Sequence, residues 1–318
     1  MLYFPFVSFF IFILFFGSVF SLCSAHWFGV WIGLEINLIG FIPIMVQETK
    51  SEEVESSVKY FLIQSVGSSL LLLGILLTFF SYGSWSLNSF GGYLCSNLML
   101  VSLMLKLGMS PFHFWLPSVV GGLSWLCNII LLTWQKVGPL FSMFFFFSIS
   151  KEFLLLLIIL SSFFGGVGGV NQTSLRGLLA YSSILHLGWV VSCLFLSLEV
   201  CFLYFVVYSF LLIMVCLLFI FMEIKNNKQF SSVFLWKKEF RVYFCLSVLS
   251  MGGMPPMLGF FMKWFVLMKL SLSSLFFISL FLILGSMVSL YYYLILSFSV
   301  ILSEEYSWKF GDFKFFFF

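Results

Sequence analysis

The sequence predicts an all-α integral membrane protein, a polytopic bundle of about ten transmembrane helices. Of its 318 residues, 62% are hydrophobic and only 8% are charged, whereas a soluble domain carries about 25% charged residues. Long apolar runs recur along the chain, and a helical span needs about 20 apolar residues. The polar, glycine- or proline-containing breaks between the runs are too short for a soluble domain. Lipid is therefore the solvent for most of this chain.

The apolar runs define the expected spans. Reading from break to break gives 2–22, 27–46, 58–80, 93–111, 119–147, 153–170, 176–198, 200–222, 240–268 and 272–298. The first run has no basic segment before it and is long enough to cross a bilayer, so we expect a retained helix rather than a signal peptide. The spans form one transmembrane domain over 1–298. A short tail, 299–318, is too polar at its start to span.

The basic residues test this division of the chain. Loops after odd-numbered spans hold only Lys151 and Lys269. The remaining loop lysines and arginines follow even-numbered spans or lie in the tail: Lys50, Lys59, Arg176, Lys225, Lys228, Lys237, Lys238, Arg241, Lys309 and Lys314. The positive-inside rule then puts the N-terminus, the even-numbered loops and the tail on the negative, cytoplasm-like side of the membrane.

Four ionisable residues remain inside the apolar runs once the loop charges are set aside: Glu35, Lys106, Lys136 and Lys263. A charge near the bilayer centre costs at least about 2.5–3.5 kcal/mol on insertion scales, so retained charges favour a functional role. The alternative is that each side chain snorkels from a helix end to the membrane surface. That alternative is strongest for Lys263, which lies near the end of its span.

Buried lysines suit proton transfer. A lysine out of water loses its preference for the charged form, and a nearby carboxylate restores that preference. Moving the carboxylate closer or further away would therefore load or unload the lysine. Glu35 beside Lys106 would make such a pair, and the sequence predicts a proton path through the four residues.

Helix-breaking residues accompany these charges. Gly108-Met109-Ser110-Pro111 follows Lys106, and Met251–Gly259, with adjacent prolines at 255 and 256, precedes Lys263. Two adjacent prolines remove two backbone donors, so a continuous helix is excluded there. Gly138-Pro139, just after Lys136, predicts a kink. Broken helices at membrane depth occur where the backbone is buried in protein or lines a wet cavity, and transporters place them at ion sites. The alternative is that both breaks are ordinary turns.

The three histidines differ in their surroundings. His186 lies in the middle of a span, where a proton relay and a hydrogen-bonded packing role are equally open. His113 sits beside the first break, and we expect it at the membrane interface. His26 is expected in a loop.

Several classes of function are excluded or disfavoured. The net charge is +3 and no basic block is present, which argues against a nucleic-acid partner. The seven cysteines are scattered without a C-x-x-C pair, so we expect small apolar core residues rather than metal ligands or disulfides. The glycines in Gly165–Gly169 favour close helix packing over phosphate binding. The sequence has no Walker motif, iron–sulfur cysteine set or catalytic triad.

Four segments resemble one family. In order and spacing, over roughly 20–270, the chain resembles subunit 2 of mitochondrial NADH:ubiquinone oxidoreductase, respiratory complex I, in its short animal-type form. The segments that carry the resemblance are Gly33-Leu34-Glu35-Ile36-Asn37, Leu105–Pro117 (LKLGMSPFHFWLP), Thr133-Trp134-Gln135-Lys136, and Gly252–Pro256 (GGMPP) with Gly259–Trp264 (GFFMKW).

The resemblance implies an antiporter-like subunit of the membrane arm, with two inverted helical repeats that each contain a broken helix. It implies that Glu35 and Lys106 form a coupled pair, that Lys136 and Lys263 continue a polar axis toward the outlet, and that His186 is a possible relay. It also implies that NADH, FMN, iron–sulfur clusters and ubiquinone bind to other subunits, so no cofactor is expected in this chain.

The same resemblance implies the surroundings of the chain. Its partners would be other membrane-arm subunits, including neighbouring antiporter-like subunits, and membrane lipids. It would lie in the mitochondrial inner membrane with its N-terminus in the matrix. One departure is that 299–318 is a poor candidate for the family's final span, which puts C-terminal contacts with a neighbouring subunit in doubt.

The leading hypothesis is a proton-translocating subunit in which quinone reduction elsewhere biases the Glu35–Lys106 pair and drives a proton along Lys136 to Lys263. One rival is a stand-alone cation/proton antiporter, which the short form disfavours. A second is a structural scaffold of the complex in which the charges serve only helix pairing. A haem-binding electron carrier is a more distant rival, because nothing in the histidine spacing favours it.

Overall fold

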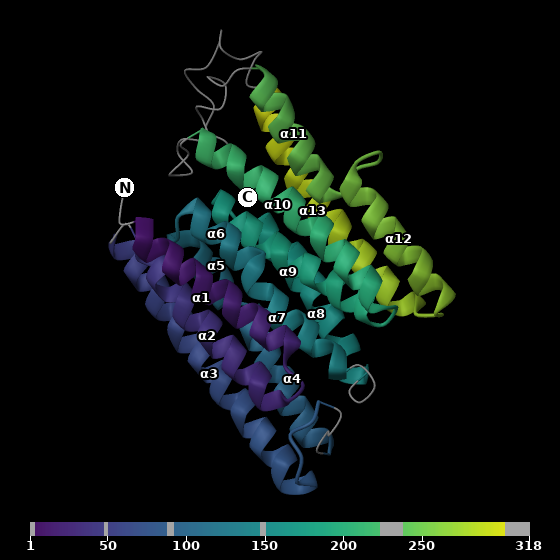
Figure 1. Ribbon diagram of the computed structural model, residues 1–318. Coiled ribbons are helices and arrows are strands. Elements are labelled where there is room, and N and C mark those ends of the chain that lie inside the picture. Colours follow the sequence, from purple (N-terminus) through teal and green to yellow (C-terminus); the bar gives the residue numbers. More distant parts are fainter. Residues whose placement is uncertain (1–3, 48–49, 88–91, 147–150, 223–237, 303–318) are drawn as a thin grey trace.

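The computed structural model describes residues 4–47, 50–87, 92–146, 151–222 and 238–302, and helices are the regular structure of these ranges (Figure 1). The N-terminal part of the bundle consists of α1 (Phe4–Cys23), α2 (Trp27–Met45), α3 (Ser51–Tyr82), α4 (Tyr93–Leu107), α5 (Trp115–Gly122), α6 (Trp125–Leu132) and α7 (Trp134–Met143). A 3₁₀ turn, η1 (Phe144–Phe146), extends α7. The remaining helices are α8 (Lys151–Val170), α9 (Leu175–Leu194), α10 (Leu198–Phe221), α11 (Lys238–Gly252), α12 (Leu258–Leu272) and α13 (Phe276–Leu302).

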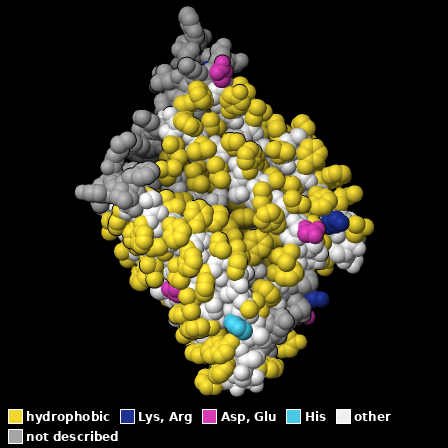
Figure 2. Space-filling model, viewed as in Figure 1, with side chains coloured by type: hydrophobic (Ala, Val, Ile, Leu, Met, Phe, Trp, Pro, Cys, Tyr) yellow, Lys and Arg dark blue, Asp and Glu magenta, His cyan; other side chains and the backbone are white. Residues whose placement is uncertain are grey.

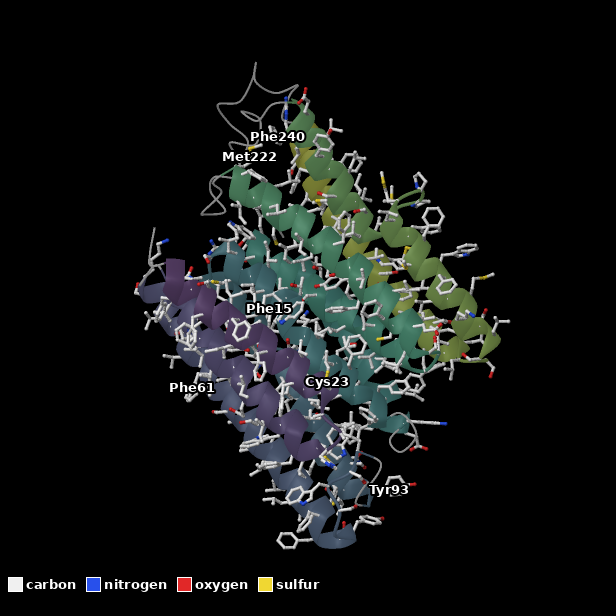
Figure 3. The ribbon with its side chains drawn as sticks, viewed as in Figure 1. Phe15, Cys23, Phe61, Tyr93, Met222 and Phe240 are labelled. Atoms are coloured by element: carbon white, nitrogen blue, oxygen red, sulfur yellow. The ribbon has the colours of Figure 1, made fainter. Side chains whose placement is uncertain are left out.

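The predicted membrane class is confirmed. In the part of the chain that the structure describes, eight helices or helix pairs are long and apolar enough to cross a bilayer, and α4 is a shorter apolar helix. The outer surface is apolar as well: Phe80 and Leu94 are each 81% exposed, and hydrophobic side chains cover most of the face in Figure 2. Phe61 on α3 points outward from the bundle (Figure 3). Lipid, not water, suits such a surface.

The bundle is built around α9. This helix is almost wholly buried, whereas α1 at one flank is mostly exposed. Figure 1 shows α1, α2 and α3 side by side at one edge and α11, α12 and α13 at the other, with α9 between them. Lys106, Lys136 and Lys263 are buried in this bundle, and Glu35 is partly buried.

Several expected boundaries change. The polar stretch before 58 is not a loop, because α3 begins at Ser51. The expected span 119–147 is interrupted, with separate helices α5, α6 and α7. The expected span 240–268 divides into α11 and α12. Helix α13 runs to Leu302 and so enters the expected tail 299–318, of which 303–318 lies outside the described residues.

Glycines set the closest helix contacts. A Cβ atom at Gly33 of α2 would lie 2.6 Å from the Ser21 backbone nitrogen of α1, and one at Gly40 would lie 2.8 Å from the Leu14 nitrogen. On α8, a Cβ at Gly165 would lie 2.5 Å from the Leu185 nitrogen of α9. The packing role expected for the glycines of 165–169 is confirmed. Small residues let helix backbones approach closely, which is a main source of helix association in lipid.

The α1–α2 contact gives a stability prediction. Gly33→Ala forces the two backbones apart, so we expect it to destabilise the protein by about 1–3 kcal/mol and to lower its melting temperature in detergent. Gly121→Ala on α5 is the matched control, since a Cβ there meets nothing within 4 Å. Equal melting temperatures for the two variants would contradict this account of the contact.

Candidate functional site

Two helices break at the same local motif. At the end of α4, Gly108 has φ +71°, and its amide and that of Met109 both donate to the Met104 carbonyl, at 2.9 and 3.2 Å. The next peptide bonds include a cis Ser110–Pro111 bond. Glycine adopts positive φ without steric cost, which is why it closes helices in this way.

The end of α11 repeats this arrangement. Gly253 has φ +86°, and its amide and that of Met254 both donate to the Leu249 carbonyl, at 3.1 and 3.2 Å. A cis Pro255–Pro256 bond follows. Both breaks thus read Gly-Met-x-Pro, and the expected interruptions of the two helices are confirmed.

A third break lies at Thr133, between α6 and α7. The kink expected at Gly138-Pro139 stays a prediction, and Pro139 lies inside α7. The Thr133 hydroxyl donates to the Ile129 carbonyl at 2.6 Å. A threonine that bonds back to the preceding turn competes with the helix and bends it. The break therefore falls three residues before Lys136.

Lys106 lies in the last turn of α4, at the first break, and is 7% exposed. Gln64 of α3 donates to the Lys106 carbonyl at 3.2 Å. The carboxylate of Glu35 on α2 is close enough to interact electrostatically with Lys106. Within the described residues, Lys106 Nζ and Glu35 Oε1 are each buried without a hydrogen-bond partner. The expected Glu35–Lys106 pair is therefore electrostatic, without a hydrogen bond between the two side chains.

An amide network joins the helices that carry Glu35 and Lys136. Gln135, next to Lys136 on α7, donates to Asn37 Oδ1 of α2 at 3.1 Å. The hydroxyl of Tyr60 on α3 donates to Gln135 Oε1 at 3.4 Å. Asn37 and Tyr60 are 2% and 3% exposed. Buried polar groups that bond to one another hold their helices in one register.

Lys136 lies on α7 just after the Thr133 break and is 2% exposed. Its Nζ has no hydrogen-bond partner among the described residues. It lies 5.7 Å from the ring centroid of Tyr208 on α10. A cation near an aromatic face is attracted by the ring quadrupole. The aromatic ring is thus a contact for this buried ammonium group.

His186 of α9 links the two lysines further along the chain. Its Nδ1 is 3.0 Å from the Tyr204 hydroxyl, and its ring centroid is 4.8 Å from that of Tyr208. Both Lys136 and Lys263 are close enough to act on it electrostatically. The hydrogen bond expected for His186 is present, and its relay role stays a prediction.

Lys263 of α12 reaches back to the second break. Its Nζ donates to the carbonyl oxygens of Gly252 at 2.9 Å and Met251 at 3.5 Å. Carbonyl groups at a helix end attract cations. Gly259 permits this approach, because a Cβ there would collide with the Ser250 carbonyl of α11. Lys263 is 6% exposed, so it points into the protein and does not snorkel.

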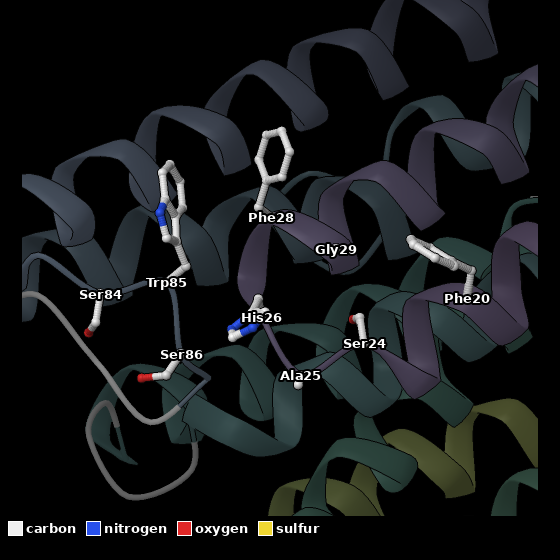
Figure 4. Close-up of a pocket in the computed structure, with 9 residues that line it drawn as sticks. All are labelled: Phe20, Ser24, Ala25, His26, Phe28, Gly29, Ser84, Trp85 and Ser86. Atoms are coloured by element: carbon white, nitrogen blue, oxygen red, sulfur yellow. The ribbon is translucent and has the colours of Figure 1, made fainter.

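The other two histidines lie apart from this line. His113 is 2% exposed and packs against the rings of Phe114, Phe164 and Tyr181. It is therefore buried in protein, and its expected position at the membrane interface stays a prediction. His26 is an exposed loop residue between α1 and α2, as expected. It borders a hollow of about 560 Å³, lined also by Phe20, Phe28 and Trp85 (Figure 4), which contains no lysine or carboxylate.

Sequence reasoning missed the neutral groups of the site. Tyr204 and Tyr208 lie four residues apart on α10, so both face α9, and Gln64 and Tyr60 lie four apart on α3. A pair of hydroxyl or amide groups at helical spacing within an apolar run is the signal that could have found them. Charge alone does not reveal it.

The geometry defines a class of protein: a polytopic helical membrane protein with buried lysines at broken helices, as in ion-translocating antiporters. The family model described as NADH:quinone oxidoreductase/Mrp antiporter, transmembrane, matches residues 24–289. NADH-ubiquinone oxidoreductase chain 2 of Locusta migratoria is 40% identical over 294 residues, covering 92% of this chain and 85% of the relative. The same chain of Anopheles gambiae is 39% identical, covering 94% and 87%.

The chain therefore belongs to the NADH:quinone oxidoreductase/Mrp antiporter family, and within it to the NADH-ubiquinone oxidoreductase chain 2 group. Solved structures share the fold. Respiratory complex I from Thermus thermophilus has a chain with a TM-score of 0.82 and 24% identity, covering 93% of this chain and 70% of that one. The Mrp complex from Dietzia sp. gives 0.80 and 14%, covering 92% and 59%. The antiporter-like fold is confirmed.

The amide network gives a prediction. Gln135→Leu leaves the buried Asn37 amide oxygen without its donor, so we expect a loss of about 1–3 kcal/mol of stability. In the Asn37→Leu/Gln135→Leu double variant neither amide is left unpaired, although the Tyr60 hydroxyl still loses its acceptor. The loss should therefore be smaller than the sum of the single losses. Melting temperatures of the solubilised protein measure all three. Strict additivity would show that the two amides act independently.

Proposed function

We propose that this chain is a core proton-translocating subunit of the membrane arm of NADH:ubiquinone oxidoreductase. The observation that carries the proposal is the burial of three lysines next to three helix breaks. The side chains of Lys106, Lys136 and Lys263 are each at most 7% exposed. Burying such groups in an apolar bundle is costly, and helix packing alone is better served by apolar residues. The names of the relatives supply the enzyme to which the subunit would belong.

The proposed path runs through two halves. In the first, Glu35 acts electrostatically on Lys106, so a change in their separation changes how firmly Lys106 holds a proton. In the second, Lys136 and Lys263 both act on His186. Entry of a positive charge at Lys136 would favour release of the next proton from Lys263, because like charges repel. The chain's own residues thus hold and pass protons.

The redox chemistry is assigned elsewhere in the same proposal. NADH oxidation and quinone reduction would take place in other subunits, which would also hold FMN, the iron–sulfur clusters and ubiquinone. The chain would contribute to a translocase without itself transferring electrons. Its partners would be membrane-arm subunits, including neighbouring antiporter-like subunits, and lipids.

We also propose the mitochondrial inner membrane as the location, with the N-terminus in the matrix. Basic residues, including Lys50 and Arg176, are concentrated in the loops that lie on the same side of the membrane as the N-terminus. Lys151 and Lys269 are the exceptions in loops on the other side. Positive loops remain on the negative side of a membrane, and the matrix is that side.

Lysine removal tests the proposal. In the assembled complex, Lys106→Met and Lys263→Met keep the apolar stem of the side chain but remove the proton-binding group. We expect each to reduce proton-coupled NADH:ubiquinone turnover on the order of tenfold or more. Proton translocation in membrane vesicles and quinone-dependent NADH oxidation are measured together.

The control is Lys59→Met. Lys59 lies on the surface of α3, where it pairs with Glu55 at 2.6 Å, and we expect little change because exposed ion pairs contribute little. Unchanged proton translocation per electron in both buried-lysine variants would overturn the proposal. Loss of assembly with normal pumping in the complex that forms would favour the scaffold role. Cation/proton exchange by the purified chain alone would favour the stand-alone antiporter.

A further inference from the structure

The ring of Tyr208 is a shared contact of Lys136 and His186. Lys136 Nζ lies 5.7 Å from its centroid, and the His186 ring lies 4.8 Å from it at an interplanar angle of 33°. These three residues come from three helices, α7, α10 and α9, and are 2%, 4% and 6% exposed. The aromatic ring therefore lies where Lys136 and His186 of the second half of the proposed path come together.

The surroundings of the Tyr208 ring indicate a role beyond filling space. Lys136 Nζ has no hydrogen-bond partner among the described residues, so the aromatic face is what offsets its charge there. His186 has a second contact on the same helix as Tyr208, with its Nδ1 3.0 Å from the Tyr204 hydroxyl. Tyr204 in turn stacks on Trp189, with centroids 6.3 Å apart and the planes at 5°. The histidine is thus held by two aromatic residues one helical turn apart.

We propose that Tyr208 is a positioning residue of the proton path, whose aromatic ring holds the protonated Lys136 side chain beside His186. The inference rests on the proposed function and deepens it. The ring stabilises the charged lysine without offering it a carboxylate, so the proton is held yet remains transferable. The hydroxyl of Tyr208 is not required for this role.

The experiment compares Tyr208→Leu with Tyr208→Phe in the assembled complex. Loss of the ring should lower proton-coupled NADH:ubiquinone turnover by about three- to tenfold, the range expected for a cation–π contact of ordinary strength. Tyr208→Phe retains the ring and should restore most of the turnover. The amount of assembled complex, measured on native gels, normalises each rate.

Phe205→Leu is the matched control. Phe205 lies on the same helix, is 6% exposed, and its ring centroid is 6.4 Å from that of Tyr208. The Phe205→Leu variant loses a ring of similar size, and we expect its turnover per assembled complex to stay near the wild-type value. A loss equal to that of Tyr208→Leu would show that ring volume alone matters, and would overturn the inference.

A second comparison separates this inference from the proposed function. If Tyr208 acts through Lys136, then Tyr208→Leu should add little to the loss caused by Lys136→Met. If the fold-losses of Tyr208→Leu and Lys136→Met multiply in the double variant, the positioning role is overturned. A Tyr208→Phe variant as impaired as Tyr208→Leu would also overturn it. Normal pumping in Lys136→Met alone would instead count against the proposed path at Lys136 itself.

Discussion

The structure depends on the cost of keeping charge and free backbone groups inside an apolar bundle. Lipid offers no hydrogen bonds, so a buried donor or acceptor without a partner in the protein is costly there. Helices meet this need for the backbone, and their breaks create the local exceptions. At the second break, Lys263 donates hydrogen bonds to carbonyl groups at the end of α11. At the first break, Gln64 donates a hydrogen bond to the Lys106 carbonyl. Helix breaks and buried polar side chains are therefore two parts of one arrangement.

The same constraint explains why the line of charges is not a chain of ion pairs. Direct pairing would fix each proton in place, since a hydrogen-bonded carboxylate holds a lysine in its charged form. Among the described residues, the contacts are weaker and more varied: electrostatic at Glu35–Lys106, aromatic at Lys136, and carbonyl at Lys263. Such contacts stabilise an ammonium group without trapping it.

The sequence predicted the charged part of this site and most of the fold. Apolar runs located the spans, and Gly-Pro motifs located the breaks after Lys106 and before Lys263, because these residues dictate backbone geometry locally. It did not predict that the polar residues from Ser51 begin α3, since propensity cannot tell a loop from the first turns of a helix. It also did not predict the break at Thr133, where the hydroxyl bonds back to the Ile129 carbonyl. The roles of Tyr204 and Tyr208 depend on which helix faces α10, which is a tertiary property.

In the proposed path, protons move between Lys106, Lys136 and Lys263. Such transfer requires water or other polar groups in the space between these side chains. Buried water occurs where polar groups offer it two or more partners, whereas apolar cavities stay dry. The most direct measurement is a high-resolution electron cryomicroscopy map of the assembled complex. The account predicts ordered water density joining Lys106 Nζ to Lys136 Nζ, both of which have no hydrogen-bond partner within the described residues. Dry apolar packing between these two groups in every state of the turnover cycle would contradict it.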